Sequence, residues 1–163
     1  MLSKRYSTLA LAACLWLICP ICGAGSAGAA EPDAIAVWAS PGLWSYHFDR
    51  NAGYRENNWG PGLQLDLTRE TAIVGGSFAN SDRARSHYAG VLWQPWALGP
   101  VRLGAFGLAM DGYPLMRNGG WFAFPIPAAS LRYDRVGVNL TVVPSYGKRL
   151  HGAVAAQFLL RVW

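Results

Sequence analysis

Cysteine is missing from most of this chain. The only three cysteines, Cys14, Cys19 and Cys22, lie in an N-terminal stretch that we expect to be removed. Without cysteine in the remainder, neither a disulfide framework nor thiolate chemistry is available to the mature protein.

The N-terminal stretch has the pattern of an export signal. Lys4 and Arg5 precede an apolar run over residues 9–22, and small residues follow it. The run is shorter than the ~20 apolar residues that a membrane-spanning helix needs, which argues against the alternative of a membrane anchor. We therefore predict a signal peptide over residues 1–29 and one domain over residues 30–163.

Long apolar runs are also absent from the predicted domain, because charges, prolines or glycines interrupt every one. The full chain carries a net charge of +5, to which Lys4 and Arg5 contribute two. This excess is too mild to indicate a nucleic-acid partner, and we expect none. The chain is nevertheless 52% hydrophobic and 13% aromatic, with 19 glycines. An exported, cysteine-free chain of this composition is typical of an outer-membrane β-barrel, with a secreted β-sandwich as the alternative.

The stretch 124–144 gives the clearest pattern and predicts a β-hairpin. Side chains alternate along residues 129–133 and again along 136–143, which puts one set on each face of a sheet. Asp134 and Arg135 form the predicted turn. Prolines bracket the hairpin, and because proline lacks an N–H they weaken the ladder at its outer ends. These prolines are Pro125, Pro127 and Pro144.

Similar alternation elsewhere predicts eight strands in all. The six outside the hairpin are expected over residues 42–50, 59–68, 71–80, 86–94, 101–110 and 151–163. Residues 31–41 show no clear period, and residues 95–100 are expected to form a turn. Longer loops follow the first, third, fifth and seventh strands, and shorter turns follow the others. This asymmetry predicts an all-β, eight-stranded antiparallel transmembrane β-barrel of the bacterial outer membrane, with its long loops outside.

Three polar residues near the predicted long loops are candidates for catalysis. His47 lies near the end of the first strand, on the inward face that it shares with Ser45. Asn80 and Ser81 lie at the end of the third strand. A histidine base and a serine hydroxyl are the minimal set for acyl transfer. The alternative is a histidine that merely lines the barrel and a serine in a loop.

Basic residues gather in the same predicted loops, and arginine binds phosphate in a bidentate manner. They are candidates for binding an anionic lipid headgroup, although the loops of any barrel carry charge. The four that we assign to headgroup binding are Arg50, Arg55, Arg83 and Arg85. No histidine shows a spacing typical of a metal site, and no glycine motif indicates a nucleotide, so we expect neither a metal nor a cofactor.

Several segments, in order, resemble the outer-membrane lipid A palmitoyltransferase (PagP) family, and they cover nearly the whole predicted domain. The family's pattern Tyr-x-Glu-x-x-Trp-Gly-x-Gly resembles residues 54–62, and its Pro-x-Pro…Ala-Ser…Tyr…Val…Pro hairpin resembles residues 125–144. Its Phe-x-Asp-Ser resembles residues 78–81, where Asn80 replaces the aspartate, and its Trp-His resembles residues 44–47.

The resemblance implies an enzyme that moves a palmitoyl chain from a phospholipid to lipid A in the outer leaflet, without a cofactor. It implies that His47 and Ser81 are catalytic, with Asn80 beside them, and that the acyl chain lies in the barrel interior. It also implies a lateral lipid gate at Pro125, Pro127 and Pro144. We expect a monomer in the outer membrane with phospholipid and lipid A as partners. The alternatives are a small barrel that is structural or lipid-binding without catalysis, or a lipid A deacylase.

Overall fold

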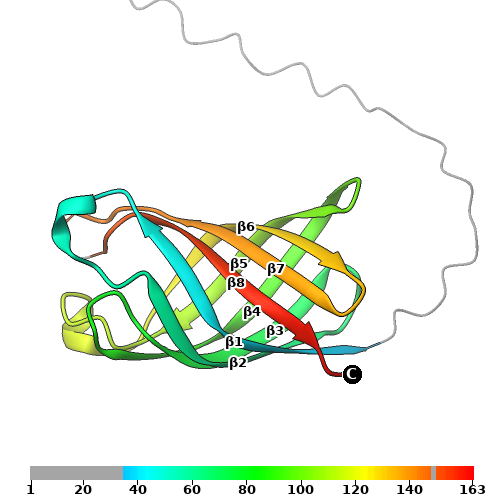
Figure 1. Ribbon diagram of the computed structural model, residues 1–163, viewed down its shortest axis with the longest axis horizontal. Helices are drawn as coiled ribbons and strands as arrows, with labels where there is room; N and C mark the ends of the chain where they lie inside the picture. Colours follow the sequence, from blue (N-terminus) through cyan, green and yellow to red (C-terminus); the bar gives the residue numbers. More distant parts are fainter. Residues whose placement is uncertain (1–34, 148–149) are drawn as a thin grey trace, which may run out of the picture. The chain divides into compact units, whose positions relative to one another are not determined.

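The computed structural model describes residues 35–147 and 150–163, so the predicted signal peptide lies outside the described residues. The described chain forms a closed antiparallel barrel (Figure 1). Its strands are β1 (Ala36–His47), β2 (Asn57–Asp66), β3 (Thr71–Ala79), β4 (Arg85–Leu98), β5 (Val101–Met110), β6 (Phe122–Tyr133), β7 (Val136–Val143) and β8 (Ala153–Arg161).

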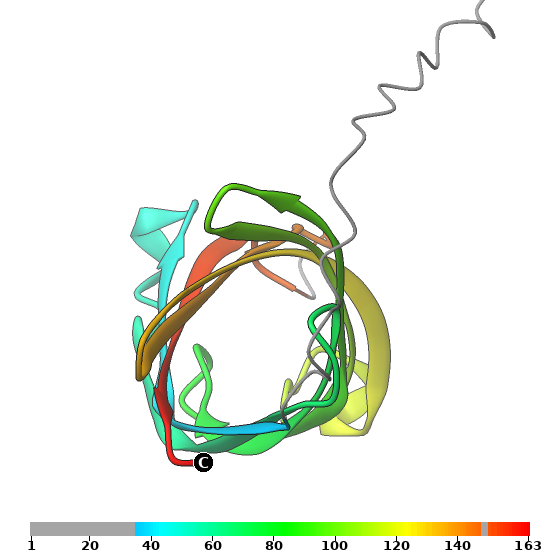
Figure 2. The same ribbon diagram turned by 90° about the vertical axis from the view of Figure 1, so that its right-hand side faces the viewer.

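Closure of the sheet depends on β1, which pairs with β2 on one side and β8 on the other. Each of the other strands pairs with its neighbours in sequence, and every pairing is antiparallel. Figure 2 looks into one end of the barrel and shows the strands forming a complete ring. Because a closed sheet has no edge strand, every strand finds partners on both sides. The predicted eight-stranded antiparallel barrel is confirmed.

The two faces of the strands differ as the alternation predicted. In β1, Ser45 and His47 point inward and are each 4% exposed, whereas Trp44 and Tyr46 point outward and are 39% and 44% exposed. The outer surface carries large apolar side chains on every strand. They include Trp59, Leu63, Ile73, Val91, Trp93, Trp96, Leu103, Leu131, Leu140, Val142, Phe158 and Leu160. None of the helices among the described residues has the length and apolar character to cross a membrane.

The first strand begins earlier than predicted. Residues 31–41 show no period, yet β1 starts at Ala36. A register shift between Ser40 and Gly42 explains the difference, because a bulge inserts a residue and reverses which positions face inward. Ser40 is inward before the shift, and Ser45 is inward after it. The alternation of side chains along β1 therefore changes phase in the middle of the strand, and no single period of two covers its whole length.

The fourth strand is longer than predicted for a similar reason. Residues 95–100 were expected to form a turn, but β4 continues to Leu98. Its pairing with β5 shifts register between Trp93 and Trp96, with Pro95 inside the irregularity. Proline is tolerated at such a bulge because a ladder hydrogen bond is already missing there.

The connections divide the barrel into two ends (Figure 1). The loop end carries the longer connections, residues 48–56, 80–84 and 111–121, and the described parts of the last one, residues 144–147 and 150–152. The turn end carries the shorter connections, residues 67–70, 99–100 and 134–135, together with the last residue, Trp163. The predicted alternation of long and short connections is confirmed, and it places all four loops on the same side.

A layer of buried polar side chains crosses the interior and is here named the polar layer: Gln64, Gln94, Ser130 and Asn139. The Ser130 hydroxyl donates to Gln94 Oε1 at 2.8 Å, and Asn139 Nδ2 donates to Gln64 Oε1 at 2.9 Å. Buried polar groups are stable only when they are paired in this way. The polar layer separates an apolar interior on the loop side from a charged interior on the turn side.

The pairing between β6 and β7 stops before β6 does. It runs from Tyr133 only as far as Ala128, whereas the pairing of β6 with β5 continues to Phe122. Pro125 and Pro127 lie in the part of β6 that has lost its β7 partner, because a proline has no N–H to donate. Both prolines are exposed. The predicted weakening of the ladder at these two prolines is confirmed.

Candidate functional site in the loop half of the barrel

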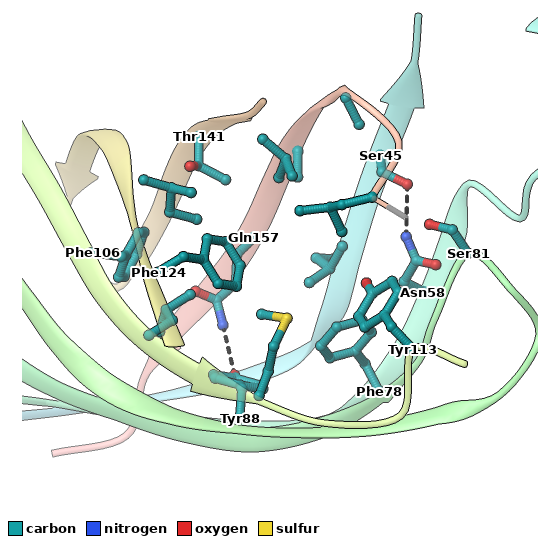
Figure 3. A pocket seen from close by; sticks show the side chains of 18 of the residues that line it. Ser45, Asn58, Phe78, Ser81, Tyr88, Phe106, Tyr113, Phe124, Thr141 and Gln157 are labelled. Atoms are coloured by element: carbon teal, nitrogen blue, oxygen red, sulfur yellow. Dashed lines mark hydrogen bonds between the residues drawn. The ribbon is translucent and has the colours of Figure 1, made fainter. Parts of the chain in front are cut away.

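An apolar cavity of about 120 Å³ occupies the loop half of the barrel. In Figure 3, Ser45, Asn58 and Ser81 gather at one end of it, and Tyr88 and Gln157 lie farther along. The apolar side chains between them come from six strands and two loops. They are Leu43, Val74, Phe78, Phe106, Leu108, Met110, Tyr113, Phe124, Ile126, Val143, Leu150, Ala153 and Ala155. The cavity thus has a long apolar wall and a polar mouth.

His47 lies at this mouth, as the last residue of β1. Its ring packs against Tyr54, with 4.9 Å between centroids, and Tyr54 packs in turn against His151 at 4.4 Å. The Nδ1 atom of His47 is buried and has no hydrogen-bond partner among the described residues. The inward orientation that the sequence predicted is therefore present, and one ring nitrogen is available to a ligand.

Asn58 supplies a second unsatisfied polar atom at the mouth. Its Nδ2 atom donates to the Ser45 hydroxyl at 2.8 Å and to the Glu56 carbonyl at 3.2 Å. Its Oδ1 atom is buried without a partner among the described residues, and the residue is 1% exposed. A buried acceptor left unpaired costs about 1–3 kcal/mol, so a ligand that donates a hydrogen bond there is favoured.

Asn58 was not singled out by the sequence analysis, which assigned residues 51–58 to a loop. The structure instead extends β2 back to Asn57, so that Asn58 has the same inward parity as Gln64. If the alternation of residues 59–68 is continued backward by one residue, it predicts that the side chain of Asn58 points inward.

Ser81 lies in the loop 80–84, is partly buried, and lines the same mouth. The backbone N–H of Arg55 donates to the Ser81 carbonyl at 3.1 Å, which ties this loop to the one that follows His47. The structure therefore brings His47, at the end of β1, and Ser81, in the loop 80–84, to one cavity. Among the described residues no hydrogen bond joins their side chains, and their catalytic role stays a prediction.

Asn80 is fully buried, and its side chain holds the loops together. Its Nδ2 atom donates to the Ser86 hydroxyl at 3.0 Å and to the Gly112 carbonyl at 2.7 Å. Its Oδ1 atom accepts from the N–H groups of Asp82 at 3.1 Å and Ala84 at 2.9 Å. Both amide hydrogens and the carbonyl oxygen are thus engaged in positioning the loop that carries Ser81. A direct part for Asn80 in catalysis stays a prediction.

Two carboxylates lie near Asn80 and Ser81 in the loops, Asp82 and Asp49. Asp82 lines the cavity beside Ser81. Asp49 is exposed, and its carboxylate accepts from the N–H of Asn51 at 3.1 Å, where it caps a short 3-10 helix. Of the two, only Asp82 contributes to the cavity.

Two tyrosines in the loops hold their protons near neutral pH. Burial raises the pKa of Tyr54, and the negative charges of Asp82 and Asp49 raise it further. Burial also raises the pKa of Tyr113 strongly, with a smaller contribution from Asp82. Both phenols are therefore neutral, and they can donate hydrogen bonds.

All four arginines assigned to headgroup binding lie at the loop end. Arg50 forms an ion pair with Glu56, and Arg85 donates to the Ser77 hydroxyl at 3.0 Å. Arg55 and Arg83 are exposed. Their common position agrees with the prediction, and their binding of a headgroup stays a prediction.

The unpaired part of β6 borders the cavity directly. Phe124 and Ile126 line the cavity, and they alternate with the exposed Pro125 and Pro127. Pro144 follows the end of β7 and is also exposed. The weakened ladder therefore lies between the apolar cavity and the outer surface.

Within residues 35–147 and 150–163, no three histidine, cysteine or acidic side chains gather as metal ligands. Comparison of the chain with protein-family models gave no match. Comparison with curated proteins gave none either.

Proposed function

We propose that this chain is an outer-membrane barrel that transfers a palmitoyl chain from a phospholipid to lipid A. The observation that carries the proposal is the cavity of the loop half. Its apolar wall leads to a mouth lined by His47, Asn58 and Ser81, where His47 Nδ1 and Asn58 Oδ1 have no hydrogen-bond partner among the described residues. An acyl chain matches the wall, and an ester linkage with its polar neighbours matches the mouth. The outward apolar side chains support a location in a membrane.

The reaction would proceed at the mouth. His47 acts as a general base and takes a proton from the attacking hydroxyl, as its open ring nitrogen allows. Attack on the phospholipid ester carbonyl forms a tetrahedral intermediate. Its collapse breaks the bond to the leaving oxygen, to which His47 returns the proton, so that a lysophospholipid is released and the palmitoyl chain stays on the attacking oxygen. Ser81 either forms an acyl intermediate or orients the acceptor hydroxyl. Asn58 Oδ1 accepts a hydrogen bond from the substrate or acceptor.

Lipid would reach the cavity through the wall. The missing β6–β7 pairing beside Pro125 and Pro127 weakens the barrel where the cavity approaches the surface. In a membrane this position lets an acyl chain enter sideways without passing the polar loops. Arg55 and Arg83, at the loop end, would hold the anionic headgroups.

Mass spectrometry of lipid A from cells with and without the gene tests the proposal. A gained palmitoyl chain supports transfer. A lost chain supports the alternative of a deacylase, and an unchanged lipid A supports a barrel that binds lipid without catalysis.

Two variants then test whether His47 and Ser81 carry out the proposed transfer. His47→Asn and Ser81→Ala should abolish the gained chain while the barrel remains folded. His87→Asn is the matched control for the histidine, because His87 is at the loop side but points outward. If this control loses activity as strongly as His47→Asn, the assignment to the cavity mouth is wrong.

A further inference from the structure

A second cavity, of about 330 Å³, lies at the turn end on the other side of the polar layer. Its walls carry arginines from three strands: Arg102 on β5, Arg132 on β6 and Arg161 on β8. We propose that this cavity binds a phosphate-bearing anion, either a phospholipid headgroup or a free phosphate. The proposal concerns the opposite end of the barrel and does not depend on the proposed acyl transfer.

The strand register aligns the three arginines along one wall. Arg102 pairs with Ser130, which lies two residues before Arg132 on the same face of β6. Arg132 pairs with Gly137 on β7. Gly137 pairs in turn with Leu159 on β8, which lies two residues before Arg161. Residues two apart in a strand point to the same face, so all three side chains face the interior.

Arg132 is held in a fixed orientation. Its Nη1 atom donates to the carbonyl oxygens of Leu131 at 3.2 Å and Val138 at 3.1 Å, and its Nη2 atom donates to Asn139 Oδ1 at 2.7 Å. Gly137 makes room for it, since a Cβ there would lie 2.7 Å from Arg132 Cδ. A guanidinium has five N–H donors, so these bonds orient the group and leave donors for a ligand.

Asp66 offsets part of the charge of Arg132, but none of the three arginines forms an ion pair with a carboxylate in the described part of the chain. Asp66 accepts from Trp38 Nε1 at 2.7 Å and from Gln64 Nε2 at 2.6 Å, and both donors are uncharged. Glu70 is the other acidic residue of the lining and lies exposed in the turn 67–70, next to Arg69.

Arg102 is the arginine best placed to bind an anion. Its side chain has no hydrogen bond or ion pair in the described part of the chain, although it is only partly exposed. Arg161, by comparison, donates to the Trp163 carbonyl at 3.0 Å. A partly enclosed charge without a counterion is costly, and an incoming anion relieves this cost. Guanidinium groups from several strands suit a tetrahedral phosphate, which accepts from several directions.

The test uses the full chain refolded in an uncharged maltoside detergent. One arm titrates it with inorganic phosphate, and the other with phosphatidylglycerol in mixed micelles, using phosphatidylcholine as the lipid reference. Calorimetry should show saturable binding in at least one arm. Binding of inorganic phosphate identifies a free phosphate ligand, and binding of phosphatidylglycerol alone identifies a lipid headgroup.

Arg102→Gln should weaken this binding roughly tenfold, as expected for the loss of a charge-assisted hydrogen bond. Arg102→Lys keeps the charge and should bind with intermediate affinity. Arg135→Gln is the matched control, because Arg135 lies exposed in the turn 134–135 at the same end and should bind as the parent does. Circular dichroism verifies the fold of each variant. Absence of saturable binding in both arms, or an Arg102→Gln variant that binds as tightly as the parent, overturns the proposal.

Discussion

The Gln157 amide donates a hydrogen bond to the Tyr88 hydroxyl at 3.0 Å, which joins β8 to β4 across the interior of the barrel. Both residues line the apolar cavity far from the Ser45–Asn58 pair at its mouth (Figure 3). Asn139 Nδ2 also donates to Gln157 Oε1 at 3.0 Å, which connects this pair to the polar layer. A hydrogen-bonded network therefore lines the inner part of the cavity, on the side of the polar layer.

For the proposed acyl transfer, we predict that the depth of the cavity down to this network limits the length of the acyl chain. Ala155 lies on β8 between Ala153 at the mouth and Gln157 at depth, and it is buried in the wall. Ala155→Met should fill the middle of the cavity, so that the variant transfers a shorter chain. Overpacking should also lower the free energy of unfolding by roughly 1–3 kcal/mol. Mass spectrometry of lipid A measures the chain, and transfer of an unshortened chain by a folded variant would contradict the prediction.

The variant His47→Asn tests the proposed role of His47 as the general base of acyl transfer. Removing a general base typically lowers a rate roughly 10²–10⁴-fold. We expect a loss in this range for acyl transfer in detergent micelles. The barrel should remain folded, because His47 Nδ1 makes no hydrogen bond that the variant would lose and the cost in unfolding is confined to the ring packing against Tyr54. His87→Asn should keep the parent rate. A His47→Asn variant with the parent rate would exclude His47 as the base.

Asn80→Ala should destabilise the loop end. It leaves the Ser86 hydroxyl, the Gly112 carbonyl and two backbone N–H groups without their partner, and we expect a loss of roughly 2–3 kcal/mol in the free energy of unfolding. Asn80→Asp should also destabilise, because a carboxylate cannot donate to Gly112. Asn57→Ala, at an exposed asparagine, is the control. Urea unfolding measures all three, and an Asn80→Ala variant as stable as this control would refute the positioning role.

The prolines of β6 can be tested by restoring their missing donors. The double variant Pro125→Ala and Pro127→Ala supplies two N–H groups, so the β6–β7 pairing should extend toward Val143. Hydrogen exchange should then slow in this part of β7, and acyl transfer should fall because lipid entry is hindered. Pro100→Ala, at the turn end, should change neither. Slower exchange with an unchanged rate would show that lipid does not enter between β6 and β7.

The pair of Asp111 and His87 predicts a pH dependence of stability. The backbone N–H of His87 donates to Asp111 Oδ1 at 2.6 Å, and this bond is the main reason that the pKa of Asp111 lies below its usual 3.8. A lowered pKa in the folded state stabilises the fold above the ordinary carboxyl value. This stability is lost as the pH falls through the folded pKa. Unfolding below about pH 4 should therefore depend less on pH in Asp111→Asn than in the parent. Parallel pH profiles would contradict the prediction.

The alternation of side chains was sufficient to predict most of the fold. In the hairpin of β6 and β7, inward Ser130 and Asn139 alternate with outward Leu131 and Leu140, so each residue's face follows from its parity. Parity also placed His47 inside. It failed in residues 31–41 and 95–100, where bulges shift the register. A bulge depends on how two strands fit together, and a local pattern does not record that fit.

The sequence by itself therefore determined the number of strands, their inner faces outside residues 31–41 and 95–100, and the positions of His47 and Ser81 near the long loops. Only the tertiary structure decided what these residues meet. Closing β1 against β8 places Tyr88 beside Gln157, and folding the loops uses every hydrogen-bonding atom of the Asn80 side chain. The reason is physical: alternation is a property of one strand, whereas contacts across a barrel depend on closure and on the relative register of strands far apart in the chain.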